Sequence, residues 1–185
     1  RFLTAYFAGR EGRSVVLTGS ERMKQRPIQV LVTALRDLGA EIGYLENNGC
    51  PPLRINGRRL NGRQVTLPAD ISSQYISALL LIAPAMAEGL ELNLEGTITS
   101  LPYIRMTLRL LSRVGIRSEM SGNRIRVYPG TGVEARTLVV ESDWSSASYY
   151  FSVAALASPG SRIELQAYRE DSLQGDSVLK DIYGK

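Results

Sequence analysis

The chain has 185 residues, of which 44% are apolar and 22% charged, a composition typical of a globular protein with one or two domains. It contains no histidine and a single cysteine, which excludes a histidine-dependent catalytic triad and an internal disulfide framework and argues against any metal site. The net charge of +4 indicates a mild preference for anionic partners.

No apolar run approaches the roughly 18 to 20 residues that a membrane-spanning helix needs. The first residues, RFLTAYFAG, lack the basic region and the cleavage site of a signal peptide. We therefore expect a cytoplasmic protein with no membrane contact. Because these first residues have the pattern of a helix interior, we also expect the chain to be a piece of a longer protein.

In chain order, alternating apolar residues predict a first strand at 15–19, and a helical apolar face predicts the helix after it. That face consists of Ile28, Leu31, Val32, Leu35 and Leu38. Further strands are predicted at 40–45, 52–56 and 63–68. The next segment, 72–87, is apolar on nearly every side, which is typical of a helix at the centre of a domain.

A strand at 90–96 leads into a second amphipathic helix. Its apolar face consists of Ile104, Thr107, Leu108, Leu111 and Val114. Strands are predicted at 124–128, after a Gly-Asn turn, and at 137–142. The segment 145–157 is again apolar nearly all round and predicts a second central helix.

The pattern repeats along the chain. LRDLGAEI at 35–42 matches LSRVGIRS at 111–118, and places Gly39 and Gly115 at equivalent helix ends. DISSQY at 70–75 matches DWSSASY at 143–149. A period of about 70 to 77 residues is too long for a solenoid of helix pairs. We predict an α/β fold of repeated strand–helix–strand–helix–strand–strand units, with the helices buried and the sheets outside.

The polar start of segment 72–87 has two interpretations. Asp70 is suited to cap the helix, in which case Ser72 and Ser73 are ordinary first-turn residues. Alternatively, the two hydroxyls and the free N–H groups of the first turn form a cradle for an anion. The residues alone leave both interpretations open.

Arginines recur at positions 105, 109 and 113 and cluster at 54, 58, 59 and 63. They fit a solvated helix face and a polar turn. A nucleic-acid groove would need aromatic residues between the arginines for base stacking, and these clusters have none. We therefore expect no nucleic-acid partner, and keep a basic nucleic-acid-binding module as the alternative from another class.

Several linked motifs resemble the enolpyruvylshikimate-phosphate synthase family of enolpyruvyl transferases. They are the stretch 17–57, SSQYISALLLIAPA at 72–85, TSLPYIRMTLRLL at 99–111, DWSSASYYFSVAA at 143–155 and SLQGD at 172–176. The resemblance extends over essentially the whole chain. It implies a two-domain enzyme with three repeated units in each domain, of which 1–140 covers most of the first domain and 141–185 begins the second.

The resemblance implies transfer of the enolpyruvyl group from phosphoenolpyruvate to the 5-hydroxyl of shikimate 3-phosphate, with release of phosphate. It implies no metal or organic cofactor, these two small molecules as partners, and a monomer. It also places Ser72 and Ser73 on the phosphate of shikimate 3-phosphate and Gln74 against its ring. Ser100 and Tyr103 reach the same phosphate, since a hydroxyl and a phenol both donate hydrogen bonds.

The second substrate has fewer implied contacts in this chain. By the same resemblance Arg26 binds the carboxylate of phosphoenolpyruvate, for which a planar guanidinium is suited, and Arg1 lies near that substrate. The general acid–base carboxylates are expected outside these 185 residues, so no catalytic residue is named. We expect the chain alone to bind shikimate 3-phosphate weakly and to turn nothing over.

A sister enzyme, the enolpyruvyl transferase that acts on UDP-N-acetylglucosamine, is the nearest alternative. It shares the predicted architecture. Its nucleotide site is not expected to reproduce the linked Ser-Ser-Gln and Ser-x-Pro-Tyr motifs, which here are Ser72 to Gln74 and Ser100 to Tyr103. The motifs therefore favour the shikimate enzyme.

Overall fold

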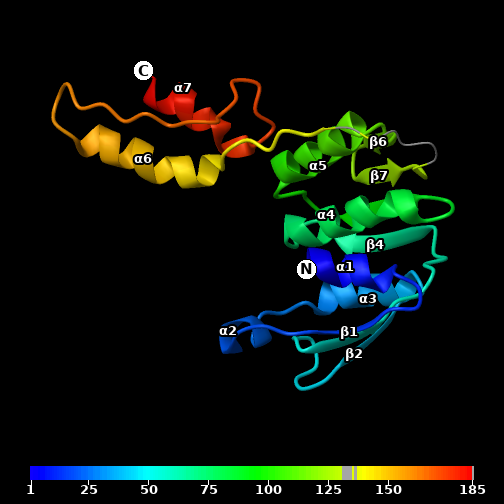
Figure 1. Ribbon diagram of the computed structural model, residues 1–185. Helices are drawn as coiled ribbons and strands as arrows, with labels where there is room; N and C mark the ends of the chain where they lie inside the picture. Colours follow the sequence, from blue (N-terminus) through cyan, green and yellow to red (C-terminus); the bar gives the residue numbers. More distant parts are fainter. Residues whose placement is uncertain (131–134, 136, 185) are drawn as a thin grey trace. The chain divides into compact units, whose positions relative to one another are not determined.

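The computed structural model describes residues 1–130, 135 and 137–184. Contacts divide the chain into two compact units, Arg1–Glu134 and Ala135–Lys185. All of the strands among the described residues belong to the first unit (Figure 1). In this described part, no helix is long and apolar enough to cross a membrane.

The first unit begins with the order helix–strand–helix–strand–strand, with one short extra helix. These elements are α1 (Phe2–Ala8), β1 (Ser14–Leu17), α2 (Glu21–Lys24), α3 (Gln29–Asp37), β2 (Glu41–Tyr44) and β3 (Leu53–Asn56). A complete strand–helix–strand–helix–strand–strand unit follows. Its elements are β4 (Gln64–Pro68), α4 (Ser73–Ile82) with the 3-10 turn η1 (Ala83–Ala85), β5 (Leu90–Glu95), α5 (Leu101–Arg113), β6 (Ser118–Ser121) and β7 (Arg124–Val127).

The two sheets have equivalent strand orders, which confirms the predicted repeat. The first is ordered β1-β3-β2 and is antiparallel. The second is ordered β4-β5-β7-β6, with β4 parallel to β5 and the other pairs antiparallel. When β1, β2 and β3 are matched to β5, β6 and β7, helices α1 and α3 correspond to α4 and α5.

Gly39 and Gly115 end α3 and α5 in the same way, as the repeat predicts. Their φ angles are 100° and 84°, in the left-handed region that favours glycine. The N–H of Gly39 donates to the Arg36 carbonyl at 2.9 Å, and the N–H of Ala40 donates to the Leu35 carbonyl at 2.9 Å. An equivalent pair of bonds closes α5. Both helices therefore end in the same hydrogen-bonded cap.

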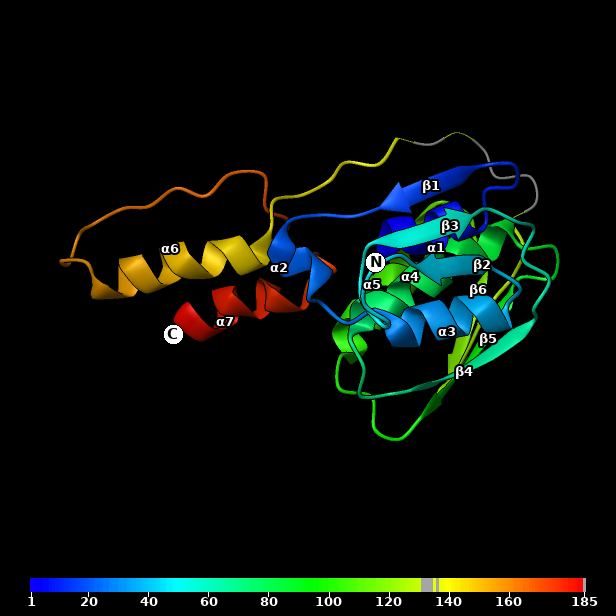
Figure 2. The same ribbon diagram turned by 90° about the horizontal axis from the view of Figure 1, so that it is seen from below.

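Helix α4 lies in the interior of the first unit, and residues Tyr75 to Leu80 are all buried. Helices α1 and α5 contact it. In Figure 2, strands β1 and β4 lie on opposite sides of α1 and α4. The prediction of buried helices between outer sheets is confirmed for this unit.

The structure differs from the predicted elements in several places. Helix α2 was not predicted because four residues make only one helical turn, and strand β6 was not predicted because Met120 is its one apolar residue and no alternation is visible. The predicted strand at 137–142 is absent: this segment makes one backbone bond to its neighbour, from the Ser142 N–H to the Ala167 carbonyl at 2.8 Å. A lone pair of segments with no further ladder does not form a stable sheet.

The second unit contains α6 (Trp144–Leu156), the 3-10 helix η2 (Gly175–Val178) and α7 (Leu179–Tyr183). The prediction that 145–157 is a central helix is correct for the helix and wrong for its surroundings. Only Trp144 and Ala147 are buried in α6, and Leu156 is 89% exposed. Within the described part of the second unit, α6 contacts the short helices η2 and α7, which cover less of it than α1 and α5 cover of α4.

Gly57, directly after β3, is the point of a close backbone approach to the end of α1. A Cβ there would overlap the Arg10 carbonyl oxygen and lie 2.7 Å from the Phe7 carbonyl oxygen. The Gly57 N–H also donates to the Arg13 carbonyl at 2.7 Å. The backbone cannot move away without losing this bond.

We predict that Gly57→Ala lowers the free energy of unfolding by about 1–3 kcal/mol, the usual cost of overpacking. Gly43→Ala is the matched control, because Gly43 lies in β2 and an added Cβ meets no atom within 4 Å. Urea unfolding followed by circular dichroism measures both variants. Equal stabilities of the two variants would contradict the close approach.

The outer face of the second sheet carries a charged cluster. Arg124 donates to the Glu91 carboxylate at 2.8 Å, and Arg126 lies 3.7 Å from the same oxygen. The hydrogen bond from Arg124, opposed in part by desolvation, holds the pKa of Glu91 below its ordinary value. The folded state therefore binds a proton at Glu91 less readily than the unfolded chain does.

A lowered folded pKa stabilises the protein above the unfolded pKa, which is about 4.3 for glutamate, and this contribution disappears as the pH falls through the folded pKa. Glu91→Gln should therefore be less stable than the unchanged chain at neutral pH, with the difference shrinking below about pH 4.3. Urea unfolding at a series of pH values measures this. Glu95→Gln, at an exposed position of the same strand, is the control, and a pH-independent difference for Glu91→Gln would contradict the ion-pair assignment.

Candidate functional site

The first turn of α4 is open rather than capped by Asp70, so that interpretation is wrong. The N-cap is Ser72, and it makes no side-chain cap hydrogen bond. Strand β4 ends at Pro68 and is followed by a turn at Ala69 and Asp70, so Asp70 lies in this turn and the helix begins beyond it, at Ser73. The first N–H groups of a helix have no partner within it, which leaves this end suited to an anion.

The matching motif in the second unit shows the opposite arrangement. Asp143 is the N-cap of α6, and its carboxylate accepts from the Ser145 N–H at 3.0 Å and from the Ser146 hydroxyl at 2.9 Å. These bonds, led by that of the Ser146 hydroxyl, lower the pKa of Asp143. The Ser145 hydroxyl donates to Asp176. The serines of this copy are first-turn residues occupied by internal bonds.

At α4 the Ser72 side chain bonds to Arg1 instead of to the helix. The Arg1 guanidinium donates to the Ser72 hydroxyl at 3.0 Å and to the Gln74 side-chain oxygen at 2.6 Å. It also lies 4.8 Å from the centroid of the Tyr75 ring, a cation–π distance. Three of the predicted site residues are therefore joined by direct contacts.

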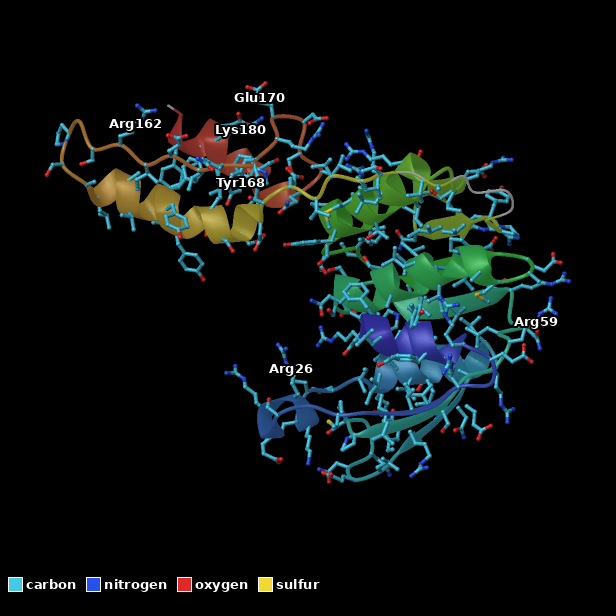
Figure 3. All side chains as sticks on the ribbon, viewed as in Figure 1. Arg26, Arg59, Arg162, Tyr168, Glu170 and Lys180 are labelled. Atoms are coloured by element: carbon cyan, nitrogen blue, oxygen red, sulfur yellow. The ribbon has the colours of Figure 1, made fainter. Side chains whose placement is uncertain are left out.

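Arg26 joins the same group through a shared pocket. The pocket has a volume of about 340 Å³, and Arg1, Gln74 and Arg26 are among its lining residues, together with Thr18 and Met23. Figure 3 shows the Arg26 side chain on the side of the first unit at which α1 and α4 begin. The structure thus brings two guanidinium groups and the mouth of α4 around one cavity.

The neighbouring basic residues are arranged differently. Lys24 pairs with Glu46 at 3.1 Å and with Glu21 at 3.3 Å, and the hydrogen bonds to these carboxylates raise its pKa. Arg26 is exposed, and its described side-chain contact is with the Met23 sulfur at 4.0 Å. Unlike Lys24, Arg26 forms no ion pair among the described contacts, and its guanidinium group lines the pocket.

Ser100 and Tyr103 lie at the start of the neighbouring helix. Ser100 is the N-cap of α5, without a side-chain cap bond, and Tyr103 is 44% exposed in the first turn. Pro102 is the second helical residue, after Leu101. The residues that line the pocket with Arg1, Arg26 and Gln74 do not include four other predicted site residues, which are Ser72, Ser73, Ser100 and Tyr103.

Helices α4 and α5 nevertheless begin at the same edge. Both follow strands of the parallel pair β4–β5, so both start where those strands end. The Ser77 and Thr107 hydroxyls, 2.8 Å apart, join the helices about one turn after the start of α4 and nearly two turns after the start of α5. Figure 1 shows α1, α3, α4 and α5 all beginning on this side. Each helix start contributes a partial positive charge, which favours anions.

Tyr75 is a site residue that the sequence reasoning missed. It is 7% exposed, and its hydroxyl donates to the Pro27 carbonyl at 2.6 Å. The available signal was a tyrosine in an otherwise aliphatic helix, since a buried phenol needs a hydrogen-bond partner.

Among the described residues, no group of three or more histidine, cysteine, aspartate or glutamate side chains could hold a metal ion.

Comparison with known proteins identifies the family of this chain. The family model described as EPSP synthase (3-phosphoshikimate 1-carboxyvinyltransferase) matches residues 1–185. A 3-phosphoshikimate 1-carboxyvinyltransferase of Bacteroides fragilis (strain YCH46) is 47% identical over 185 residues, which are 100% of this chain and 45% of that protein. One of Edwardsiella ictaluri is 40% identical over 94% of this chain and 40% of that protein.

A solved EPSP synthase structure from Acinetobacter baumannii is similar with a TM-score of 0.66 and 26% identity, over 84% of this chain and 34% of that one. The chain thus spans less than half the length of the relatives that it matches. Because the family model matches the chain throughout, this chain belongs to the EPSP synthase family.

Proposed function

We propose that this chain forms part of an enzyme that transfers the enolpyruvyl group of phosphoenolpyruvate to the 5-hydroxyl of shikimate 3-phosphate and releases phosphate. The observation that carries the proposal is the convergence of Arg1, Arg26 and the uncapped start of α4 on one pocket. Both substrates are phosphorylated, and phosphoenolpyruvate also carries a carboxylate. A site of guanidinium groups and helix starts supplies the positive potential that these anions require.

In this proposal the phosphate of shikimate 3-phosphate lies at the starts of α4 and α5. Ser72 and Ser73 donate to it from one helix, and Ser100 and Tyr103 from the other, while Gln74 lies against the ring. Because Ser72 accepts its bond from Arg1, its own hydroxyl proton is free to point toward the anion. Arg1 therefore orients a donor of the phosphate site.

Phosphoenolpyruvate takes the other end of the pocket. The planar fork of Arg26 suits a bidentate contact with its carboxylate, and Arg1 lies between the two substrates. Holding the two substrates side by side removes much of the entropic cost of their encounter. Proton transfer requires acids and bases that we place in other parts of the protein.

The remaining parts of the proposal rest on the family resemblance alone. Residues 1–140 belong to the domain that binds shikimate 3-phosphate, and 141–185 to the other domain. The enzyme is cytoplasmic, acts as a monomer, and uses neither a cofactor nor a nucleic-acid partner. The substrate assignment is supported by the linked serine motifs and is tested against UDP-N-acetylglucosamine below.

We predict that Ser72→Ala/Ser73→Ala weakens the binding of shikimate 3-phosphate by at least about tenfold, because each bond to a charged group is worth about 1.5–3 kcal/mol. Calorimetric titration of the 185-residue chain at low salt measures this. Ser145→Ala/Ser146→Ala in the matching motif is the control and should bind as the unchanged chain does. Preferential binding of UDP-N-acetylglucosamine by the unchanged chain would favour the sister transferase instead.

We predict that Arg26→Lys raises the Kd for phosphoenolpyruvate by about tenfold, since an ammonium group keeps the charge and loses the bidentate geometry. Arg22→Lys is the matched control, because Arg22 is exposed in α2 and does not line the pocket. The same titration, with phosphoenolpyruvate in the syringe, measures both. An equal effect of the two substitutions would remove Arg26 from the site.

A further inference from the structure

Tyr75 makes one contact with each half of the candidate site. Its ring supports the Arg1 guanidinium, with 4.8 Å between the guanidinium carbon and the ring centroid. Its hydroxyl donates to the Pro27 carbonyl at 2.6 Å. The residue is 7% exposed, so it lies beneath the pocket and does not line it.

The ring acts on the Arg1 half. An arginine side chain has several rotatable bonds, and its guanidinium would otherwise sample many positions in solvent. The flat aromatic face restricts it to a layer above Tyr75, where it reaches both Ser72 and Gln74. This contact depends on the ring and does not require the hydroxyl.

The hydroxyl acts on the Arg26 half. The side chain of Arg26 has no ion pair among the described contacts, so its position depends on its backbone. The Arg26 N–H donates to the Met23 carbonyl at 3.1 Å within the same turn. Directly after Arg26, two bonds join the chain to other segments: the Pro27 carbonyl accepts from Tyr75, and the Ile28 N–H donates to the Gly49 carbonyl at 2.8 Å. Proline has no N–H, so the carbonyl is the backbone group through which Pro27 can form a hydrogen bond.

We propose that Tyr75 is a positioning residue for both halves of the site. It positions Arg26, which binds phosphoenolpyruvate, and Arg1, which lies beside the binding site for shikimate 3-phosphate. The ring fixes Arg1 over the start of α4, and the hydroxyl fixes the turn that carries Arg26. The two parts of one side chain therefore serve different ligands. This inference rests on the proposed function for the identity of those ligands.

The test separates the ring from the hydroxyl with Tyr75→Phe and Tyr75→Leu. Tyr75→Phe keeps the ring beneath Arg1 and removes the bond to Pro27. It should raise the Kd for phosphoenolpyruvate about two- to tenfold, the change that one hydrogen bond supplies. The Kd for shikimate 3-phosphate should stay within about twofold, because Arg1 keeps its support. Tyr75→Leu should raise both values.

Titration of the 185-residue chain with each ligand measures these effects. A purely structural role would weaken both ligands equally in Tyr75→Phe, and that result would overturn the inference, as would unchanged binding of phosphoenolpyruvate. Tyr75→Leu removes buried volume and destabilises the fold. If this variant does not fold, the result for Tyr75→Phe alone tests the inference.

Amide hydrogen exchange provides a measurement without ligand. In Tyr75→Phe, exchange at Arg26 and Ile28 should be faster than in the unchanged chain, while exchange at Leu79 inside α4 should be unchanged. Equal exchange at Arg26 and Ile28 would overturn the inference. If the unchanged chain binds neither ligand, the proposed site is contradicted in this chain, and the exchange result still decides the role of Tyr75.

Discussion

The structure of the first unit depends on the burial of α4, a helix whose sides are apolar and whose first turn is polar. Its residues from Tyr75 to Leu80 are buried, and helices α1 and α5 contact it. Burial fixes the axis of this helix, and the axis fixes where its free N–H groups point. A helix start on the surface would be solvated on all sides and would hold an anion loosely. Here the rigid interior holds the start of the helix at the edge of a pocket, so the apolar packing positions the polar site.

The repeat multiplies this effect. Because β4 and β5 are parallel, α4 and α5 begin at the same edge, and the hydroxyl pair of Ser77 and Thr107 holds them together shortly after their starts. Several helix starts with weak individual potentials then act on the same region. The guanidinium groups of Arg1 and Arg26 come from segments before and after β1, and both line the pocket beside these helix starts. The site is therefore assembled by the fold from residues that are distant in the sequence.

Much of the fold could be predicted because its signals are local. Gly39 and Gly115 mark two helix ends from their place in a repeat, and alternation marks most of the strands. The errors arose where the outcome depends on distant partners. Asp70 has the chemistry of a cap, but it lies in the turn that joins β4 to the helix, next to Ala69, whose N–H bonds to the distant Glu95 carbonyl. The 137–142 segment has the composition of a strand and lacks a ladder to join. Tyr75 was missed because its two partners, Arg1 and Pro27, are far from it in the chain.

The two matching Asp–Ser–Ser motifs illustrate how a binding site can arise from a small change in where a helix begins. At α6 the aspartate occupies the N-cap and bonds to the first turn, whereas at α4 the helix starts at a serine and the turn is left open. A missing cap typically costs about 1 kcal/mol of helix stability. An anion that bonds to the open turn restores that interaction, and so serves as the cap that the sequence omits. Occupancy of the site and the stability of the central helix are then thermodynamically linked, so an anion that binds at this turn also stabilises the folded state of the first unit.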